Sequence, residues 1–408
     1  GGSASRTFTI TINEPVAVLS ISTISSTLTR GLSMPPVTLT NTGGAIATFA
    51  ISPALPTGLT LSSTTGSISG TPTVNSTATT YTVYANNTGG SASKTITITI
   101  NEPASSLNVS STNSVLTRGT TMTDVTISTS GGIVEQWAID PALPAGLAFS
   151  LTTGSVTGTP TVNMSTTIFT IWANNTGGSS AVQISITINE PVPVLSASHS
   201  TAILTRSEMM SAITMSNTGG MIATWQIHPA LPAGLSFSSS TGAITGTPSV
   251  NMTSTTYTIW ANNSGGATSV NVSITINEPV AILSPSLSAT NLTRGVMMTP
   301  LTMTNTGGMV AVWAIHPALP AGLSFDSTSG AISGTPIVNM TTQTWTVWAN
   351  NSGGAAFTTI AITINEPIAI LSISNTTSTL IRTAPVWPIT ITNSGGAIAS
   401  FAIEPELP

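Results

Sequence analysis

Charged residues are scarce in this chain of 408 residues. Lys and Arg number seven, Asp and Glu number twelve, and together they make up 5% of the chain, whereas ordinary globular domains carry roughly 25%. This scarcity excludes a basic nucleic-acid footprint and an acidic interaction tail. It does not indicate disorder, because 40% of the residues are hydrophobic and their pattern is periodic.

Cysteine is absent, and no long apolar run occurs. Without disulfides the chain must be stabilised by packing, as is common in the cytosol and equally compatible with a prokaryotic surface protein. No apolar run approaches the roughly 18 residues that span a bilayer. The chain begins at Gly1 without an initiator methionine or signal peptide. We therefore expect an internal window of a longer repeat array, not natural ends that complete each other between two copies.

What the chain has instead is repetition with a period of 88 residues. The tetrapeptide INEP recurs at this interval from Asn13 to Asn365, and the motifs LTR and PALP keep the same spacing. The repeats predict four whole domains between two partial ones. The expected boundaries are 1–12 for the last strand of a truncated repeat, 13–100, 101–188, 189–276 and 277–364 for whole repeats, and 365–408 for the first part of another.

Each repeat has the composition of a β-domain. Ser and Thr form about a third of the chain, and short runs rich in Val, Ile and Thr alternate with turn signals such as Gly-Gly pairs. This pattern predicts an all-β fold of tandem immunoglobulin-like antiparallel β-sandwiches, with about seven strands per repeat. The repeats join without a Gly/Ser linker, and a proline follows each joint, so we expect a rod-like array.

The motifs of the fourth repeat resemble a known family. PALPAGLSFDSTSGAISGTPIVN (317–339), followed by TWTVWANNSGG (344–354), is similar to the He-PIG family of immunoglobulin-type domains on bacterial and archaeal surface proteins. The resemblance implies extracellular architecture and adhesion rather than catalysis. The family pattern usually has Thr where this chain has Tyr84, Trp172, Trp260 and Trp348, so these aromatic residues call for a reason specific to this protein.

Catalytic chemistry finds no support in the motifs. His228 and His316 occupy a repeat position that is Ser52 or Asp140 in other repeats, and such a variable position is not that of a catalytic base. Covalent Lys–Asn crosslinks need a lysine in each domain, and Lys94 is the only one. We therefore predict a protein that is not an enzyme and has no cofactor.

Calcium at the joints is the one metal to consider. The Glu of INEP lies at each joint, but a hard cation wants six to eight oxygen ligands, typically including several carboxylates. Each joint recurrently supplies only one carboxylate. A weak calcium site is therefore an alternative rather than the expectation.

The recurring Glu and Arg residues have a simpler interpretation as structural charge pairs. Each Glu precedes an Arg by 16 residues. In a chain with so few charges, each Glu can pair with the Arg that follows it, and the pair can set the angle between neighbouring sandwiches. The alternative is that the Glu and the Arg are two independent, solvated charges. The residues are Glu14, Arg30, Glu102, Arg118, Glu190, Arg206, Glu278, Arg294, Glu366 and Arg382.

Strand parity separates two kinds of aromatic residue. Trp137 precedes an Ile by two residues, as do its equivalents, and resembles the buried aromatic of immunoglobulin-like sandwiches. In the strand FTIWANN, Phe169 and Ile171 compete for the core, so Trp172 is predicted to face outward unless a bulge shifts the parity. Its repeat equivalents are Tyr84, Trp260 and Trp348.

Two sets of N-x-S/T triplets keep the 88-residue spacing. One set, in a predicted loop, is Asn75, Asn163, Asn251 and Asn339; the other, on the aromatic strand, is Asn86, Asn174, Asn262 and Asn350. We predict N-linked glycans at both sets. At the second set the first sugar is expected to lie against the outward aromatic two residues earlier. The alternatives are that this aromatic packs against a neighbouring chain or domain, or that it belongs to the core.

Taken together, these features predict an extracellular, cell-surface structural protein that self-associates into a glycosylated fibre, sheath or surface layer. Exposed edges of Thr-covered sheets favour such assembly unless sugars shield them. The alternative is the stalk of a surface adhesin whose binding domain lies outside this segment. Neither reading involves nucleic acid or a membrane span within the segment.

Overall fold

Alternating apolar and polar side chains build the two longest strands of each repeat. In the computed structural model, which describes residues 2–406, β7 (Ser76–Asn87) and β8 (Gly90–Asn101) pair antiparallel around a two-residue turn. Tyr81, Val83 and Ala85 of β7 are buried, and the residues between them are exposed or half-buried. The period of two therefore turns one face of the hairpin into the core.

This hairpin is the centre of a four-stranded sheet with the order β2-β8-β7-β4. β2 runs parallel to β8, whereas the other neighbours are antiparallel. A second layer consists of the pairs β1-β3 and β5-β6, which the bridge between Val37 and Ile68 connects. The remaining strands are β1 (Leu19–Ile21), β2 (Ser25–Thr29), β3 (Leu39–Asn41), β4 (Thr48–Ser52), β5 (Leu59–Leu61) and β6 (Ile68–Gly70).

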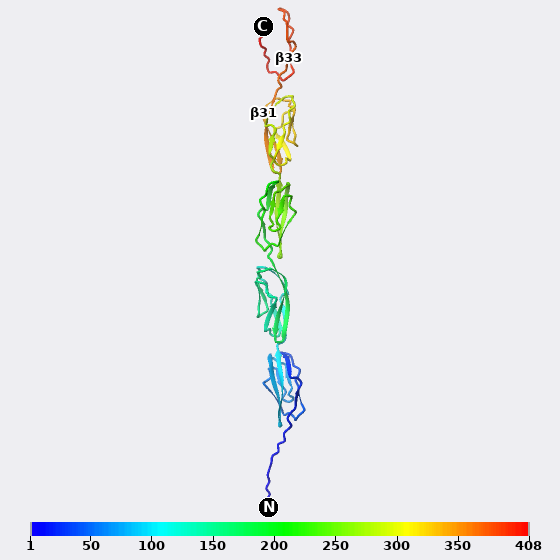
Figure 1. Ribbon diagram of the computed structural model, residues 1–408, viewed down its shortest axis with the longest axis vertical. Helices are drawn as coiled ribbons and strands as arrows, with labels where there is room; N and C mark the ends of the chain where they lie inside the picture. Colours follow the sequence, from blue (N-terminus) through cyan, green and yellow to red (C-terminus); the bar gives the residue numbers. More distant parts are fainter. Residues whose placement is uncertain (1, 407–408) are drawn as a thin grey trace. The chain divides into compact units, whose positions relative to one another are not determined.

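The same eight-stranded sandwich occurs four times in residues 2–406 (Figure 1). The chain divides into two units after Pro191, and each unit contains two complete sandwiches. The second sandwich comprises β9 (Ser105–Val109), β10 (Asn113–Thr117), β11 (Ile127–Gly131), β12 (Gln136–Asp140), β13 (Leu147–Phe149), β14 (Val156–Gly158), β15 (Met164–Asn175) and β16 (Gly178–Asn189).

The second unit repeats this architecture and ends in a partial repeat. Its third sandwich comprises β17 (Leu195–Ala197), β18 (Thr201–Thr205), β19 (Met215–Asn217), β20 (Thr224–His228), β21 (Leu235–Phe237), β22 (Ile244–Gly246), β23 (Met252–Asn263) and β24 (Gly266–Asn277). The fourth comprises β25 (Leu283–Pro285), β26 (Ala289–Thr293), β27 (Met303–Asn305), β28 (Val312–His316), β29 (Leu323–Phe325), β30 (Ile332–Gly334), β31 (Met340–Asn351) and β32 (Gly354–Asn365). The partial repeat contributes β33 (Leu371–Ile373) and β34 (Ile391–Asn393).

The all-β sandwich prediction is confirmed, with one difference in strand direction. The expected sandwich was purely antiparallel, but β2 pairs in parallel with β8, as do its equivalents in the other repeats. The chain reaches this arrangement because β1 joins the second layer and β2 crosses to the edge of the first. A local pattern of alternating residues carries no information about strand direction.

The aromatic strand has the predicted parity. Phe169 is 1% exposed and Ile171 and Ala173 are fully buried, whereas Trp172 and Asn174 lie half-buried on the opposite, outer face. A bulge does interrupt this strand, but it falls between Met164 and Thr167, before the aromatic residues. Register is then continuous to the hairpin turn, so the bulge leaves the parity of Trp172 unchanged.

A glycine fixes the position of the core tryptophan in the second sandwich. Trp137 is 6% exposed and lies against Gly154, whose φ is +68°. A Cβ at Gly154 would approach the indole ring to 2.4 Å. Only a residue without a side chain fits here, because both the left-handed backbone and the ring oppose a Cβ.

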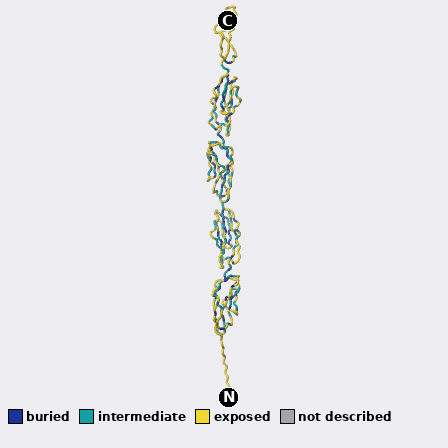
Figure 2. Tube along the Cα trace, turned by 90° about the vertical axis from the view of Figure 1, so that its right-hand side faces the viewer, coloured by how far each residue is buried: buried dark blue, intermediate teal, exposed yellow. Residues whose placement is uncertain are grey.

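The two end segments differ from the complete repeats (Figure 2). Residues 2–12, expected to form the last strand of a truncated repeat, form no strand and are exposed. No other strand of that repeat lies within the described chain to accept their backbone hydrogen bonds.

Between complete repeats, Asn101 is the last residue of β8, so the first sandwich ends one residue later than the predicted boundary.

Candidate functional site

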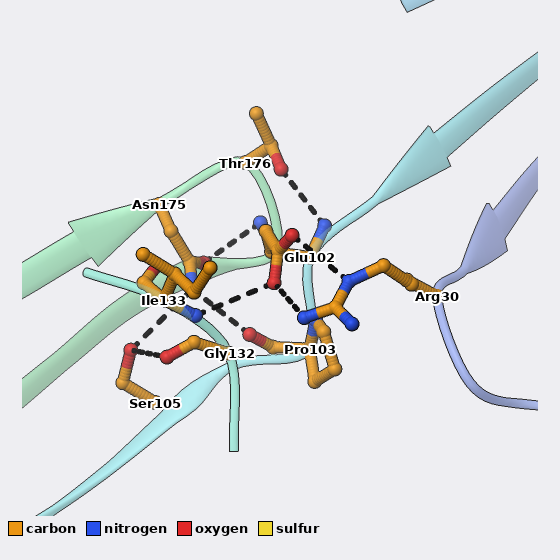
Figure 3. Close-up of polar contacts among 9 residues, drawn as sticks. Arg30, Glu102, Pro103, Ser105, Gly132, Ile133, Asn175 and Thr176 are labelled. Atoms are coloured by element: carbon orange, nitrogen blue, oxygen red, sulfur yellow. Dashed lines mark hydrogen bonds and ion pairs between the residues drawn. The ribbon is translucent and has the colours of Figure 1, made fainter. Parts of the chain in front are cut away.

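An ion pair joins the first sandwich to the residues that begin the second (Figure 3). Arg30 follows β2, and Glu102 follows β8. Arg30 Nε donates to Glu102 Oε1 at 2.9 Å, and Nη2 donates to Oε2 at 2.7 Å. This two-pronged geometry is the strongest that a guanidinium and a carboxylate can form.

The observed partners differ from the predicted pairing at 16 residues. Arg30 pairs with Glu102, 72 residues later, and not with Glu14. The parallel pairing of β2 and β8 explains the difference, because Thr29 lies opposite Asn101 and places the next residue of each strand side by side. Glu14 and Arg382 form no ion pair within residues 2–406. The recorded pairs are Arg30–Glu102 at 2.7 Å, Arg118–Glu190 at 2.6 Å, Arg206–Glu278 at 2.7 Å and Arg294–Glu366 at 2.5 Å.

Glu102 also belongs to the second sandwich through its other contacts. The Ile133 N–H donates to Glu102 Oε2 at 3.3 Å, and the Glu102 N–H donates to Thr176 Oγ1 at 2.8 Å. The residue is only 4% exposed. Through its carboxylate and its backbone N–H, Glu102 therefore ties the end of one sandwich to two loops of the next (Figure 3).

The hairpin turn of the second sandwich completes the joint. Asn175 Nδ2 donates to the carbonyls of Pro103 at 2.9 Å and Ile133 at 3.1 Å. Gly177 N–H donates back to Asn175 Oδ1 at 2.9 Å. A Cβ on Gly177 would lie 1.9 Å from the Glu102 carbonyl oxygen, so the turn can approach the joint this closely only with glycine.

The second unit contains the same joint between its two sandwiches. The carboxylate of Glu278 binds Arg206 and accepts from the Met309 N–H at 3.3 Å. The Glu278 N–H donates to Ser352 Oγ at 2.8 Å, and Asn351 Nδ2 donates to the Pro279 carbonyl at 2.7 Å. The motifs INEP and ANN-T/S-GG thus recur because they meet at the joint.

The ion pair shifts the pKa of both partners. The Arg30 hydrogen bonds, opposed by burial, lower the pKa of Glu102 below its ordinary value, with a further contribution from the Ile133 N–H. Arg206 does the same to the pKa of Glu278. The pKa of each Arg in the four pairs is raised by its Glu partner, first through the side-chain hydrogen bond. The joint carboxylates are therefore ionised at neutral pH.

The outer face of the four-stranded sheet holds the second group of predicted residues. Tyr84 is 37% exposed there, and Trp172, Trp260 and Trp348 are half-buried. Trp348 lies opposite Phe357 on the neighbouring strand, with ring centroids 4.9 Å apart. Asn86, Asn174, Asn262 and Asn350 lie on the same face, each two residues after its aromatic. Glycosylation at these asparagines stays a prediction.

The histidines of the chain lie at the surface. His199, His228 and His316 are exposed. Within residues 2–406, His, Asp and Glu side chains do not gather in threes as a metal site would require. In that same range, helices long and apolar enough to cross a membrane are not found.

Replacing Glu102 with Gln is expected to loosen the joint while leaving both sandwiches folded. Gln keeps the size of the side chain but loses the charge-assisted hydrogen bonds, at a cost of about 1–3 kcal/mol. Hydrogen–deuterium exchange resolved by peptides measures this as faster exchange in segments that contain the Glu102 and Ile133 amides. The control is Glu135→Gln, which removes an exposed carboxylate from the same sandwich. Equal exchange in the two variants would contradict a joint held by Glu102.

Acid is expected to open the same joint. Because the pKa of Glu102 is lowered in the folded protein, its contribution is complete above the ordinary Glu pKa of about 4.3 and is lost as pH falls through the folded value. A carboxyl carbon NMR titration of the full chain measures this transition, and Glu102→Gln identifies the resonance. Loosening of the joint between pH 5 and 7 would be inconsistent with this assignment.

Comparison with curated proteins finds serine-rich adhesins of Staphylococcus aureus. The chain is 30% identical over 155 residues to the serine-rich adhesin for platelets of strain MRSA252, a match that covers 36% of this chain and 11% of the adhesin. For strain MW2 the identity is again 30%, over 36% of this chain and 6% of the adhesin. The chain thus corresponds to a small part of the length of these relatives.

Solved structures with a similar fold are also arrays of Ig domains. The N-terminal eight Ig domains of Down syndrome cell adhesion molecule match 95% of this chain and 60% of their own, at 12% identity and a TM-score of 0.30. An I-band fragment of titin matches 65% of this chain and 97% of its own, at 16% identity and a TM-score of 0.33. TM-scores this low carry no argument about function.

The family profile described as "Putative Ig domain" (He-PIG) matches residues 14–101, 103–189, 192–277 and 279–365. These four matches cover most of the chain, and they begin and end at the joints. The first match ends at Asn101, as β8 does. The chain therefore belongs to the He-PIG family of Ig domains, of which it contains four consecutive copies.

Proposed function

We propose that the chain is a segment of an extracellular structural protein that serves as a spacer or a structural link at a cell surface. The observation that carries this proposal is the joint, which uses the same ion pair and the same backbone contacts wherever it lies within one unit. A joint with several directed hydrogen bonds restricts bending more than a Gly/Ser linker does. Repeating one such joint suits a load-bearing spacer.

The preferred form of this function is a glycosylated fibre, sheath or surface layer built by self-association. Near-identical repeats offer the same outer sheet face and the same strand edges at regular intervals along the chain. Exposed edges of this kind favour pairing between chains. Catalysis is not part of the proposal, because the recurrent polar residues form joints and turns.

The stalk of an adhesin is the second candidate. The match to the serine-rich adhesins favours it, because those relatives extend far beyond the part that this chain matches. In a stalk the repeats hold a separate binding domain away from the cell. The same joints serve either purpose, so the assembly state distinguishes the two candidates.

Two measurements on native cells test the function. Protease treatment of intact cells is expected to release peptides of this chain, and their retention until lysis would refute an extracellular location. Negative-stain microscopy of the released or purified full-length protein separates the two candidates. Ordered filaments or sheets support the fibre, whereas isolated threads with a distinct end support the stalk.

A further inference from the structure

An open pocket lined by uncharged residues lies beside each joint between complete sandwiches of one unit. In the first unit its volume is about 400 Å³, and its walls are the loop and bulge after Asn75, the end of β8 and the hairpin turn of the second sandwich. Thr77, Thr99, Asn101 and Thr176 provide hydroxyl and amide groups around it. Because Thr176 belongs to the second sandwich, an occupant of this pocket touches both domains.

The pocket recurs with the same residue positions in the second unit. Its volume there is about 410 Å³, and Asn251, Thr253, Thr275, Asn277 and Ser352 occupy the corresponding places. A third pocket, of about 500 Å³, lies beside Asn339. The first two are lined without any charged side chain. Uncharged walls that combine hydroxyl and amide groups with apolar surface suit a neutral, polyhydroxylated ligand.

The two sets of N-x-S/T triplets differ in how the fold uses them. At the Asn174 triplet, the hydroxyl of Thr176 accepts the Glu102 N–H and the middle Asn175 holds the joint. Ser352 and Asn351 do the same in the second unit. The register of this set therefore has a structural explanation that needs no sugar.

The triplets at the pocket have no such explanation. Asn75 and Asn251 are exposed, as are the hydroxyl residues Thr77 and Thr253. Across residues 2–406, the side chains of these four residues make no hydrogen bond to the rest of the protein. Asn163 and Asn339 are exposed in the same register, followed by an exposed Ser or Thr two residues later. An acceptor sequence that the fold does not need, repeated at every repeat, points to modification.

We propose that Asn75, Asn163, Asn251 and Asn339 carry N-linked glycans and that, at Asn75 and Asn251, the first sugar lies in the pocket beside the joint. In the reaction, the Asn amide nitrogen forms a bond to C1 of a glycan carried on a lipid phosphate. The bond from C1 to the phosphate oxygen breaks, and the lipid phosphate leaves with that electron pair. The amide nitrogen releases one proton to the solvent. The proposal rests on the extracellular location, because this modification accompanies export.

The sugar acts on the joint from the side opposite the ion pair. β8 has β2 and Arg30 on one side and the bulged end of β7 on the other. A sugar held between the bulge and Thr176 therefore supports the joint where no ion pair exists. Because the occupant is neutral, its contribution persists in salt or acid that weakens the Arg–Glu pair.

Intact-glycopeptide mass spectrometry of the full-length protein from its native cells tests the assignment. The variant carries Asn→Gln at 75, 163, 251 and 339, and the matched control carries Asn→Gln at 86, 174, 262 and 350. The expected result is glycan mass on peptides of the first set, lost in the variant and retained in the control. A glycosylated surface protein from the same cells confirms that the modification machinery is active. Glycans only on the second set, or bare asparagines at both sets, would overturn the proposal.

A second measurement tests the place of the sugar at the joint. Loss of the glycans in the first variant is expected to speed hydrogen–deuterium exchange in peptides that contain Glu102 or Glu278. Unchanged exchange in these peptides would refute a sugar seated in the pocket. A protein with bare asparagines that is nevertheless released from intact cells by protease refutes the glycans alone, whereas a protein retained inside the cells refutes the proposed function.

Discussion

Replacing Phe169 with Ala is expected to cost the second sandwich about 3–5 kcal/mol, as deletion of a buried aromatic side chain does. Phe169 is 1% exposed and packs in the core with Ile171, Ile184 and Val156. A domain of this size has only 5–15 kcal/mol of stability in total, so the loss is a large part of it. Peptide-resolved hydrogen–deuterium exchange in denaturant is expected to show this loss within residues 105–189 and little change in the other sandwiches.

The control is Trp172→Ala, three residues along the same strand. Trp172 is larger than Phe169 but lies on the outer face of the sheet, so its removal leaves no core cavity. We expect a loss of about 1 kcal/mol, which is the centre of the distribution for point mutations in general. If Trp172→Ala costs as much as Phe169→Ala, the parity of this strand and the outward aromatic face are wrong.

Gly154→Ala is expected to destabilise the second sandwich by about 2–5 kcal/mol through two separate effects. Its φ of +68° is unfavourable for a residue with a Cβ, and that Cβ would lie 2.4 Å from the Trp137 ring. The backbone effect contributes about 1–2 kcal/mol, and overpacking of the core contributes about 1–3 kcal/mol. Near-ultraviolet circular dichroism of the variant is expected to show a changed environment for Trp137.

Gly119→Ala separates these two effects within the same sandwich. Gly119 has a φ of +80°, but its Cβ would meet open space. This variant is therefore expected to lose only the backbone part, with an unchanged tryptophan spectrum. Equal losses in the two variants would show that the indole ring moves aside and that Gly154 does not position it.

Local patterns predicted the architecture well. The 88-residue period predicted the four complete repeats, and alternating residues predicted a sandwich without helices. The parity of Trp172 was also correct, because Phe169, Ile171 and Ala173 form a continuous buried row that leaves its face outside. The repeats were predicted from the spacing of recurring motifs. The strands and their faces were predicted from hydrophobic periodicity, which burial enforces along a strand.

Partners far apart in the sequence were harder to predict. The nearest Arg to Glu102 along the chain is Arg118, 16 residues away, yet Glu102 pairs with Arg30 at a separation of 72. The role of Thr176 was missed for a similar reason, since its triplet with Asn174 was interpreted only as a glycan acceptor. A signal was present, because INEP and ANN-T/S-GG recur with the same period and neither has a local reason to do so.

In the complete repeats, the sequence by itself determined the period, the fold class and the buried face of the aromatic strand, because these follow from the spacing of motifs and of apolar residues along the chain. Only the tertiary structure decided which charges meet, which strands run parallel and which acceptor triplets the fold already uses. Arg30 reaches Glu102 because β2 crosses to the edge of β8, and Thr176 reaches Glu102 because a glycine allows the turn to approach it. Contacts of this kind depend on how strands pair across long sequence separations, and residue spacing does not encode that pairing.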